Sequence, residues 1–192
     1  MRRIGIDFDN TIICYDAVFS AAAIARGLLP GDFLGTKTEV RDAVRALPDG
    51  ERTWQALQGH VYGAGIGGAT PFVGFSAFLE RARDAGAEVV VVSHKTLFGH
   101  HDSAQVNLRE AALGWLDTQG FFAADGGLAR ERVHFAPTRD DKLRRIAALA
   151  PEVFIDDLPE VLDDPKFPAG VRPLLFSGDW GEASEAVFDE RA

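Results

Sequence analysis

Short apolar runs alternate with helical stretches along this chain of 192 residues, and this alternation constrains the fold more than any other feature. The four consecutive valines at residues 89–92 are typical of a central parallel strand that is buried on both faces. Strands that alternate with helices favour an α/β fold, in which right-handed crossovers join an open parallel sheet. We therefore predict a sheet of strands at residues 3–6, 88–93, 133–135, 153–157 and 174–176.

The segments between the predicted strands carry helical periodicity and stop signals. Thr36 and Glu39 have the spacing of a capping box at the start of one such helix. No strand pattern lies between the first and second predicted strands, so the helices expected there should form a compact insertion, at residues 15–29, 37–47 and 50–62. Later helices are expected at residues 75–85, 103–119 and 139–150.

The glycine-rich segment at the end of the insertion has two interpretations. Gly63, Gly65 and Gly68 formally match a dinucleotide-binding glycine pattern. However, no predicted strand precedes them, and Thr70 and Pro71 follow instead of a helix. A flexible hinge explains these glycines better.

Carboxylates lie at the ends of two predicted strands. Asp7 and Asp9 end the first, and Asp156 and Asp157 end the fourth, while Ser93 ends the second. Burying an ionised carboxylate without a partner is costly, so a cation or a reacting group should lie beside these side chains. Because ligands bind at the carboxyl ends of the strands in such sheets, we expect the polar groups to meet in one place.

These carboxylates could carry out the hydrolysis of a phosphate monoester. Asp7 can attack phosphorus to give an aspartyl-phosphate, and Asp9 can protonate the leaving group and later deprotonate water. Asp156 and Asp157 offer hard oxygen ligands that, together with Asp7 and the backbone carbonyl of Asp9, suit octahedral Mg²⁺.

Ser93 and Lys142 could hold the phosphate, and Lys142 would also offset the charge of the carboxylates. Each residue has an ordinary explanation when it is taken alone. Ser93 could simply form a turn, and Lys142 could lie on a solvated helix face. The ordered combination of all these residues favours a site.

Composition excludes several other classes of protein. The 29 acidic and 20 basic side chains give a net charge of −9, which disfavours duplex nucleic acid as a partner. The single cysteine, Cys14, excludes an intramolecular disulfide framework and favours a reducing compartment. Asp7 and Asp9 interrupt any signal peptide, and the apolar run at residues 17–25 is too short to span a bilayer. We expect a soluble cytoplasmic protein with no membrane partner.

His94, His100 and His101 invite a zinc interpretation. The chain offers these histidines no cysteine partner as a zinc ligand, and the histidines do not have the fixed spacing of a zinc site. Surface or substrate-pocket histidines are the better explanation.

The motifs taken together resemble the haloacid dehalogenase superfamily of phosphotransferases. Residues 7–11 (Asp-Phe-Asp-Asn-Thr) are similar to its first motif, and the valine run that ends at Ser93 is similar to its second. Lys142 at a helix start and residues 153–157 are similar to its third and fourth motifs. The resemblance implies a three-layer Rossmann-like fold with strand order 5-4-1-2-3. It also implies a catalytic core at residues 1–15 and 71–192, with a small helical cap at residues 16–70.

The resemblance assigns roles to individual residues. Catalysis would fall to Asp7, Asp9, Ser93 and Lys142, and metal binding to Asp7, Asp9, Asp156 and Asp157. Substrate binding would fall to Asn10, Thr11, Ser93, His94, Lys95 and Lys142. The chain departs from the family pattern at His94 and Lys95, which are bulky where small or amide side chains are more usual. Alternatives to Lys142 as the cation of the third motif are Lys95, Arg139 and Arg144.

We therefore expect a Mg²⁺-dependent phosphatase that acts on a small soluble phosphate ester, such as a sugar phosphate or a mononucleotide, through an aspartyl-phosphate. The acid at Asp9 favours phosphatase over dehalogenase chemistry. Two alternatives stay open: phosphoryl transfer to a second substrate, as in a mutase, and a phosphate-sensing or scaffolding protein without turnover. Receiver domains combine similar residues, but there the acidic pair precedes the phosphorylated aspartate. The sequence gives no indication of the oligomeric state.

Overall fold

The computed structural model describes residues 2–189 and contains a five-stranded parallel sheet. Its strands are β1 (Arg3–Ile6), β4 (Glu88–His94), β5 (Val133–Ala136), β6 (Val153–Asp156) and β7 (Arg172–Leu175). Their order across the sheet is β5-β4-β1-β6-β7. When the five strands are numbered along the chain, this is the predicted order 5-4-1-2-3. The α/β fold with a parallel sheet is confirmed.

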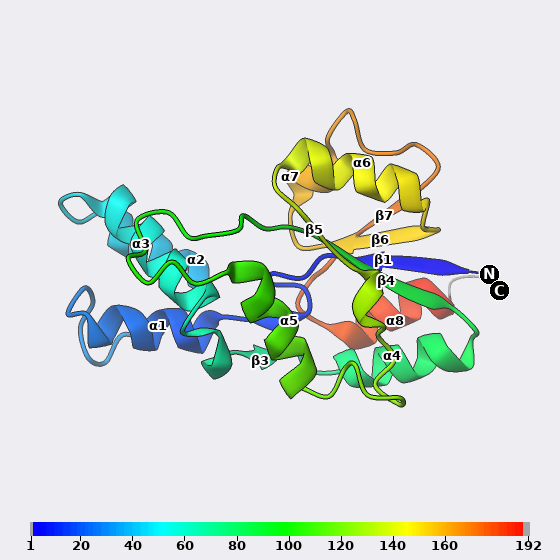
Figure 1. Cartoon of the computed structure of the whole chain (residues 1–192), viewed down its shortest axis with the longest axis horizontal. Helices are drawn as coiled ribbons and strands as arrows, with labels where there is room; N and C mark the ends of the chain where they lie inside the picture. The colour runs from blue at the N-terminus through cyan, green and yellow to red at the C-terminus, as the bar shows by residue number, and fades with distance from the viewer. Residues whose placement is uncertain (1, 190–192) are drawn as a thin grey trace. The chain divides into compact units, whose positions relative to one another are not determined.

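Helices cover both faces of this sheet (Figure 1). The helices α6 (Arg139–Leu149) and α7 (Pro159–Leu162) lie on one face, and α4 (Phe75–Asp84) and α8 (Trp180–Phe188) lie on the other. The core beneath α6 and α7 is aliphatic with one aromatic ring, and it comprises Val92, Leu143, Ile146, Phe154, Val161, Leu162 and Val171. On the opposite face the core is aromatic, because Trp180 packs against Phe75, Phe78 and Phe176.

Contacts divide the described residues into two compact units. Unit 1 comprises residues 2–13, 71–95 and 116–189, and it contains the five-stranded sheet. Unit 2 comprises residues 14–70 and 96–115. Unit 2 thus includes the expected insertion together with a second segment that the sequence did not separate from the core. The assignment of residues 16–70 as a cap over a catalytic core stays a prediction.

Unit 2 is built around three helices, α1 (Asp16–Ala25), α2 (Lys37–Arg45) and α3 (Gly50–Tyr62). Phe19 stacks on Trp54 with ring centroids 4.9 Å apart. The capping box predicted for Thr36 and Glu39 is present at the start of α2. A short 3₁₀ helix, η1 (Ile66–Gly68), occupies the glycine-rich segment, and β2 (Ile13–Cys14) pairs with β3 (Thr70–Pro71) in a separate two-stranded sheet.

Two glycines explain why the segment 96–115 belongs to unit 2. A Cβ atom added to Gly99 would lie 2.4 Å from the Cα atom of Gly59 in α3, and one added to Gly59 would lie 3.1 Å from the Cα atom of Gly99. The backbones of α3 and the segment therefore approach each other more closely than any side chain would allow.

The helix predicted at residues 103–119 begins later than expected, as α5 (Leu108–Thr118). The side chain of Asn107 accepts hydrogen bonds from the backbone N–H groups of Arg109 at 3.0 Å and Glu110 at 3.2 Å, so it caps the helix. Before it, His101 and Gln105 adopt φ angles of 56° and 46°, which no helical residue adopts. The predicted start was therefore wrong by several residues.

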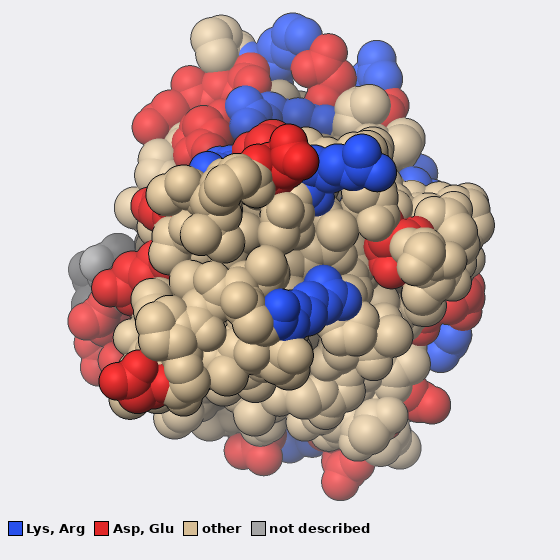
Figure 2. Space-filling model, turned by 90° about the vertical axis from the view of Figure 1, so that its left-hand side faces the viewer, with Lys and Arg blue, Asp and Glu red and all other residues tan. Residues whose placement is uncertain are grey.

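Charged side chains are unevenly distributed on the surface. Figure 2 shows one face whose middle is formed mostly by residues other than Lys, Arg, Asp and Glu, with charges of both signs interspersed toward the rim. Between residues 2 and 189 the structure has no helix with the length and apolar character needed to cross a bilayer.

Candidate active site

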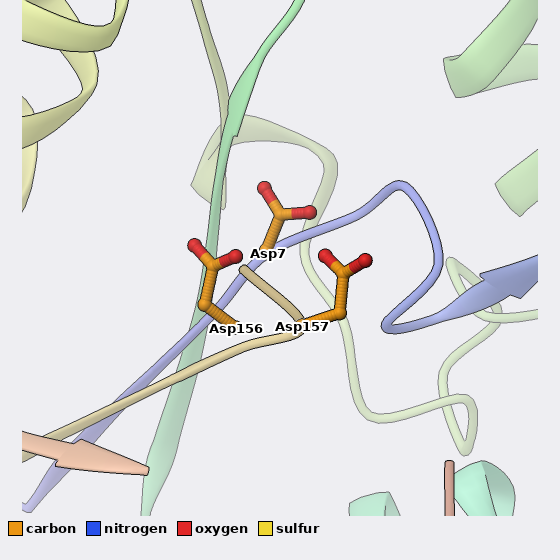
Figure 3. Close-up of side chains that lie close together, drawn as sticks. All are labelled: Asp7, Asp156 and Asp157. Atoms are coloured by element: carbon orange, nitrogen blue, oxygen red, sulfur yellow. The ribbon is translucent and has the colours of Figure 1, made fainter. Parts of the chain in front are cut away.

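Three carboxylates converge at the carboxyl ends of β1 and β6. β1 pairs with β6 so that Ile6 lies opposite Ile155, and the backbone N–H of Asp7 donates to the carbonyl oxygen of Ile155 at 2.8 Å. This register places Asp7, which directly follows β1, beside Asp156, the last residue of β6. One carboxylate oxygen from each of Asp7, Asp156 and Asp157 lies within 4.8 Å of the others. Figure 3 shows the three carboxylate groups pointing the same way from the two strand ends.

Lys142 reaches this cluster from the first turn of α6. Thr138 caps that helix by accepting a hydrogen bond from the backbone N–H of Asp141 at 3.1 Å. The Nζ atom of Lys142 donates to Oδ1 of Asp7 and to Oδ2 of Asp156, both at 2.6 Å, and the side chain is almost fully buried. Lys142 therefore joins the ends of two strands by charge-assisted hydrogen bonds.

Burial and charge act in opposite directions on these groups. Burial by itself disfavours the Lys142 ammonium, but the carboxylates of Asp7 and Asp156 outweigh it and raise the pKa of Lys142 above its ordinary value. Burial and the nearby Asp7 carboxylate raise the pKa of Asp156 to about 7, although Lys142 acts in the opposite direction. The charge of the Asp7 carboxylate thus favours the protonated form of Asp156 in the absence of a cation.

The alternatives to Lys142 lie elsewhere. Arg144 donates to Asp141 on the exposed side of α6, and Arg139 is exposed at the start of that helix. Lys95 is buried, but it contacts a different carboxylate. Its Nζ atom lies 2.9 Å from both Oδ1 and Oδ2 of Asp9. Lys95 and Lys142 are thus both buried beside carboxylates of this sheet edge.

A tight turn after β1 carries Asp9 past the strand end. The carbonyl oxygen of Phe8 accepts hydrogen bonds from the N–H groups of Ile12 at 3.0 Å and Ile13 at 3.2 Å. Asn10 takes a left-handed φ of 59°, which asparagine tolerates better than most residues. The Asn10 side chain donates to Oδ2 of Asp157 at 3.3 Å, so the turn also contacts the acidic cluster.

The turn is held by a residue that sequence analysis did not single out. The indole N–H of Trp180, a fully buried side chain of α8, donates to the carbonyl oxygen of Thr11 at 3.1 Å. Thr11 itself is buried, and within the described residues its Oγ1 atom has no hydrogen-bond partner. The sequence feature that could have predicted α8 is Asp179, whose side chain caps the start of the helix.

Ser93 and His94 lie at the same edge of the sheet, at the end of β4. Ser93 is buried, at the level of Phe135 in β5. His94 is exposed, and its Nε2 atom lies 3.1 Å from the carbonyl oxygen of Pro137. Among residues 2–189, the group of three or more potential metal ligands is the aspartate cluster, and no histidine belongs to it.

The chemistry of this donor set fits a divalent cation. Carboxylate oxygens are the ligands that Mg²⁺ prefers, and thiolate or imidazole ligands are missing from the cluster. With every group ionised, Asp7, Asp9, Asp156 and Asp157 contribute four negative charges, and Lys95 and Lys142 contribute two positive ones. The remaining two negative charges equal the charge of one divalent cation.

Comparisons with known proteins give similarity in structure but not in sequence. No protein-family model and no curated protein matches this chain. A haloacid dehalogenase (HAD) family hydrolase from Deinococcus radiodurans, solved with bound phosphate and sodium, is similar with a TM-score of 0.56 and 16% identity, over 98% of this chain and 88% of that one. A predicted phosphatase from Clostridium acetobutylicum is similar with a TM-score of 0.58 and 11% identity, over 97% of both chains.

A haloacid dehalogenase-like hydrolase from Streptococcus pneumoniae gives the same result. Its TM-score is 0.56 at 11% identity, over 100% of this chain and 92% of that one. At such low identity these similarities concern the fold, and they extend over nearly the whole chain.

Proposed function

We propose, on the premise that this chain has the fold of the haloacid dehalogenase superfamily, that it hydrolyses small phosphate monoesters with Asp7 as the nucleophile. The observation that carries the proposal is the cluster of Asp7, Asp156 and Asp157, whose oxygen atoms lie within 4.8 Å of one another. The bound phosphate in the Deinococcus structure and the description of the Clostridium protein as a phosphatase support the same class of reaction.

Each step of the proposed reaction uses a group that the structure brings to the sheet edge. Lys142 donates to Oδ1 of Asp7, so we assign the attack on phosphorus to Oδ2. As the phosphorus–oxygen bond of the ester breaks, the leaving oxygen takes a proton from Asp9. Asp9 then removes a proton from water, which attacks the aspartyl-phosphate and releases inorganic phosphate and the Asp7 carboxylate.

We propose Mg²⁺ as the cation, held by Asp7, Asp156, Asp157 and the backbone carbonyl of Asp9. When bound, it would neutralise charge on the carboxylates and on the phosphoryl oxygens. Ser93 is proposed to donate a hydrogen bond from its hydroxyl to a phosphoryl oxygen, and Asn10, Thr11 and His94 are further candidates for contact with the substrate. We also propose residues 16–70, within unit 2, as the cap that selects the substrate.

The test is release of inorganic phosphate from a panel of sugar phosphates, mononucleotides and 4-nitrophenyl phosphate in Mg²⁺. Asp7→Asn preserves the shape of the side chain but removes the nucleophile, so we expect turnover to fall at least roughly a thousandfold. Asp84→Asn is the matched control, because the Asp84 side chain is 77% exposed and lies on α4. Undiminished turnover in Asp7→Asn would remove Asp7 from its role.

The same assay separates the alternatives. A mutase or another phosphotransferase would form the acyl-phosphate on Asp7 and pass the phosphoryl group to an added acceptor, without net release of inorganic phosphate. A phosphate-sensing protein would bind orthophosphate without forming the acyl-phosphate at all. Rapid quenching with a radiolabelled phosphate donor, followed by detection of label on the protein, distinguishes these outcomes.

A further inference from the structure

Lys95 directly follows β4, and its side chain is a buried cation. Its backbone N–H donates to the carbonyl oxygen of Ala136 at 2.9 Å, next to the last pair of β4 and β5, His94 and Ala136. This pairing fixes the point from which the side chain leaves the sheet. The side chain is only 1% exposed, so it is not a solvated surface lysine.

The Lys95 ammonium makes a charged contact with Asp9. It lies 2.9 Å from each carboxylate oxygen of Asp9, and 5.4 Å from the centre of the Phe8 ring. An exposed lysine that held such a geometry would lose side-chain entropy, and the ion pair would add little stability in return. Burial, the contact with Phe8, the hydrogen bond to Oδ1 and the ion pair with Oδ2 instead restrict the Asp9 carboxylate to one orientation.

The ion pairs of the two buried lysines thus involve different carboxylates. Lys142 contacts Asp7 and Asp156, the proposed nucleophile and a proposed metal ligand. Lys95 contacts Asp9, which the proposed mechanism uses for proton transfer. A proton donor acts well only if it lies within hydrogen-bond reach of the leaving oxygen, so its orientation limits the rate.

We infer that Lys95 is the positioning residue of Asp9, which it holds in the orientation needed for both proton transfers. This inference rests on the proposed function, because it assigns Asp9 as the acid and base. The role of Lys95 is indirect, and its removal acts on the reaction through Asp9. The effect of removing Lys95 should therefore depend on the leaving group in the same way as the effect of removing the acid.

The experiment is a double-mutant cycle of Lys95→Met and Asp9→Asn in Mg²⁺, with an alkyl phosphate and 4-nitrophenyl phosphate as substrates. We expect Lys95→Met to lower kcat at least about tenfold for the alkyl phosphate and less than threefold for the aryl phosphate, whose leaving group needs little protonation. In the Asp9→Asn background, Lys95→Met should change kcat less than about twofold, because the two residues act as one unit.

Two controls keep the result interpretable. Lys166→Met makes the same substitution at a lysine whose side chain is 66% exposed, and it should leave kcat unchanged for both substrates. If Lys95→Met does not fold, Lys95→Gln removes the charge but retains a hydrogen-bond donor, and the same coupling with Asp9→Asn is expected.

Additive losses in the cycle, or equal losses for the two substrates, would overturn the inference. Additive losses accompanied by a raised KM and weaker inhibition by orthophosphate would show instead that Lys95 binds the phosphoryl group directly. The proposed function is judged separately, by wild-type phosphate release that Asp7→Asn abolishes. The phosphatase activity can therefore be confirmed even if the cycle contradicts the role of Lys95.

Discussion

The Nζ atom of Lys142 lies 2.6 Å from Oδ1 of Asp7, although 135 residues separate the two along the chain. The same ammonium lies 2.6 Å from Oδ2 of Asp156. One buried cation thus connects the carboxyl ends of β1 and β6. This arrangement makes the stability of the protein depend on the charges of its candidate site.

Lys142→Met should destabilise the protein strongly. The substitution removes the ammonium but leaves the buried carboxylates of Asp7 and Asp156 facing each other, and breaking a buried ion pair in this way costs about 3 to 5 kcal/mol. Urea denaturation in EDTA gives the free energy of unfolding. The exposed Lys166→Met is the control and should change it by less than about 0.5 kcal/mol. Equal stability of the two variants would show that the carboxylates do not need Lys142.

The contribution of Asp156 to the stability of the metal-free protein should fall as the pH rises from about 4 to about 7. The pKa of Asp156 is raised to about 7 in the folded protein, against about 3.9 in an unfolded chain. Between these values the unfolded state releases a proton that the folded state retains, so unfolding becomes more favourable with rising pH. Below about pH 4 the contribution is fully present, and above about pH 7 it is lost.

Comparison with Asp156→Asn isolates this contribution. The variant cannot titrate at this position, so its free energy of unfolding should vary less with pH over that window. The difference in slope should approach about 1.4 kcal/mol per pH unit. Unfolding curves at pH 5, 6, 7 and 8 in EDTA provide the measurement. Parallel pH profiles for the two proteins would contradict the pKa shift.

Addition of Mg²⁺ should stabilise the protein at neutral pH. A cation that binds only the folded state adds about 2.7 kcal/mol at one hundred times its Kd, which for a chain of this size raises Tm by roughly 5 to 10 °C. Asp157→Asn removes one ligand and should reduce this shift, whereas the exposed Asp84→Asn should preserve it. Thermal unfolding in EDTA and in Mg²⁺ measures both effects. An unchanged Tm in Mg²⁺ would argue against a cation site at the aspartate cluster.

Gly99→Ala and Gly114→Ala should have opposite effects on stability. A Cβ atom on Gly99 would lie 2.4 Å from the Cα atom of Gly59, so the backbones must separate, at a cost of about 1 to 3 kcal/mol. Gly114 lies inside α5, and no atom lies within 4 Å of its added Cβ, so alanine should stabilise the helix by roughly 0.5 to 1 kcal/mol. Chemical denaturation of both variants checks the signs. Stabilisation by Gly99→Ala would mean that the two segments do not pack closely.

The strands were predictable because their signals are local. Buried parallel strands appear as continuous apolar runs, and the carboxylates directly after them mark the strand ends without knowledge of any partner. The last strand was predicted at residues 174–176, but β7 begins two residues earlier, at Arg172, and includes Pro173. Proline is tolerated there because β7 is an edge strand, and the sequence alone did not identify the edge.

The contacts of the charged side chains were less predictable. Both Lys95 and Lys142 could be predicted from the sequence as site residues, but the carboxylate that each lysine contacts could not. That assignment depends on which strands are neighbours, since Lys95 and Asp9 lie 86 residues apart. The segment before α5 was misassigned for a similar reason. Its left-handed residues, His101 and Gln105, are not types that signal a break in a helix as glycine or proline would.

The hydrogen bond from Trp180 to the carbonyl oxygen of Thr11 joins residues that lie 169 positions apart. During synthesis on a ribosome, the turn that carries Asp9 therefore emerges long before the indole that secures it. Until α8 docks, a nascent chain would hold its first strand without the anchor for the adjoining turn. The turn that carries Asp9 should thus gain this anchor late in folding, when α8 docks.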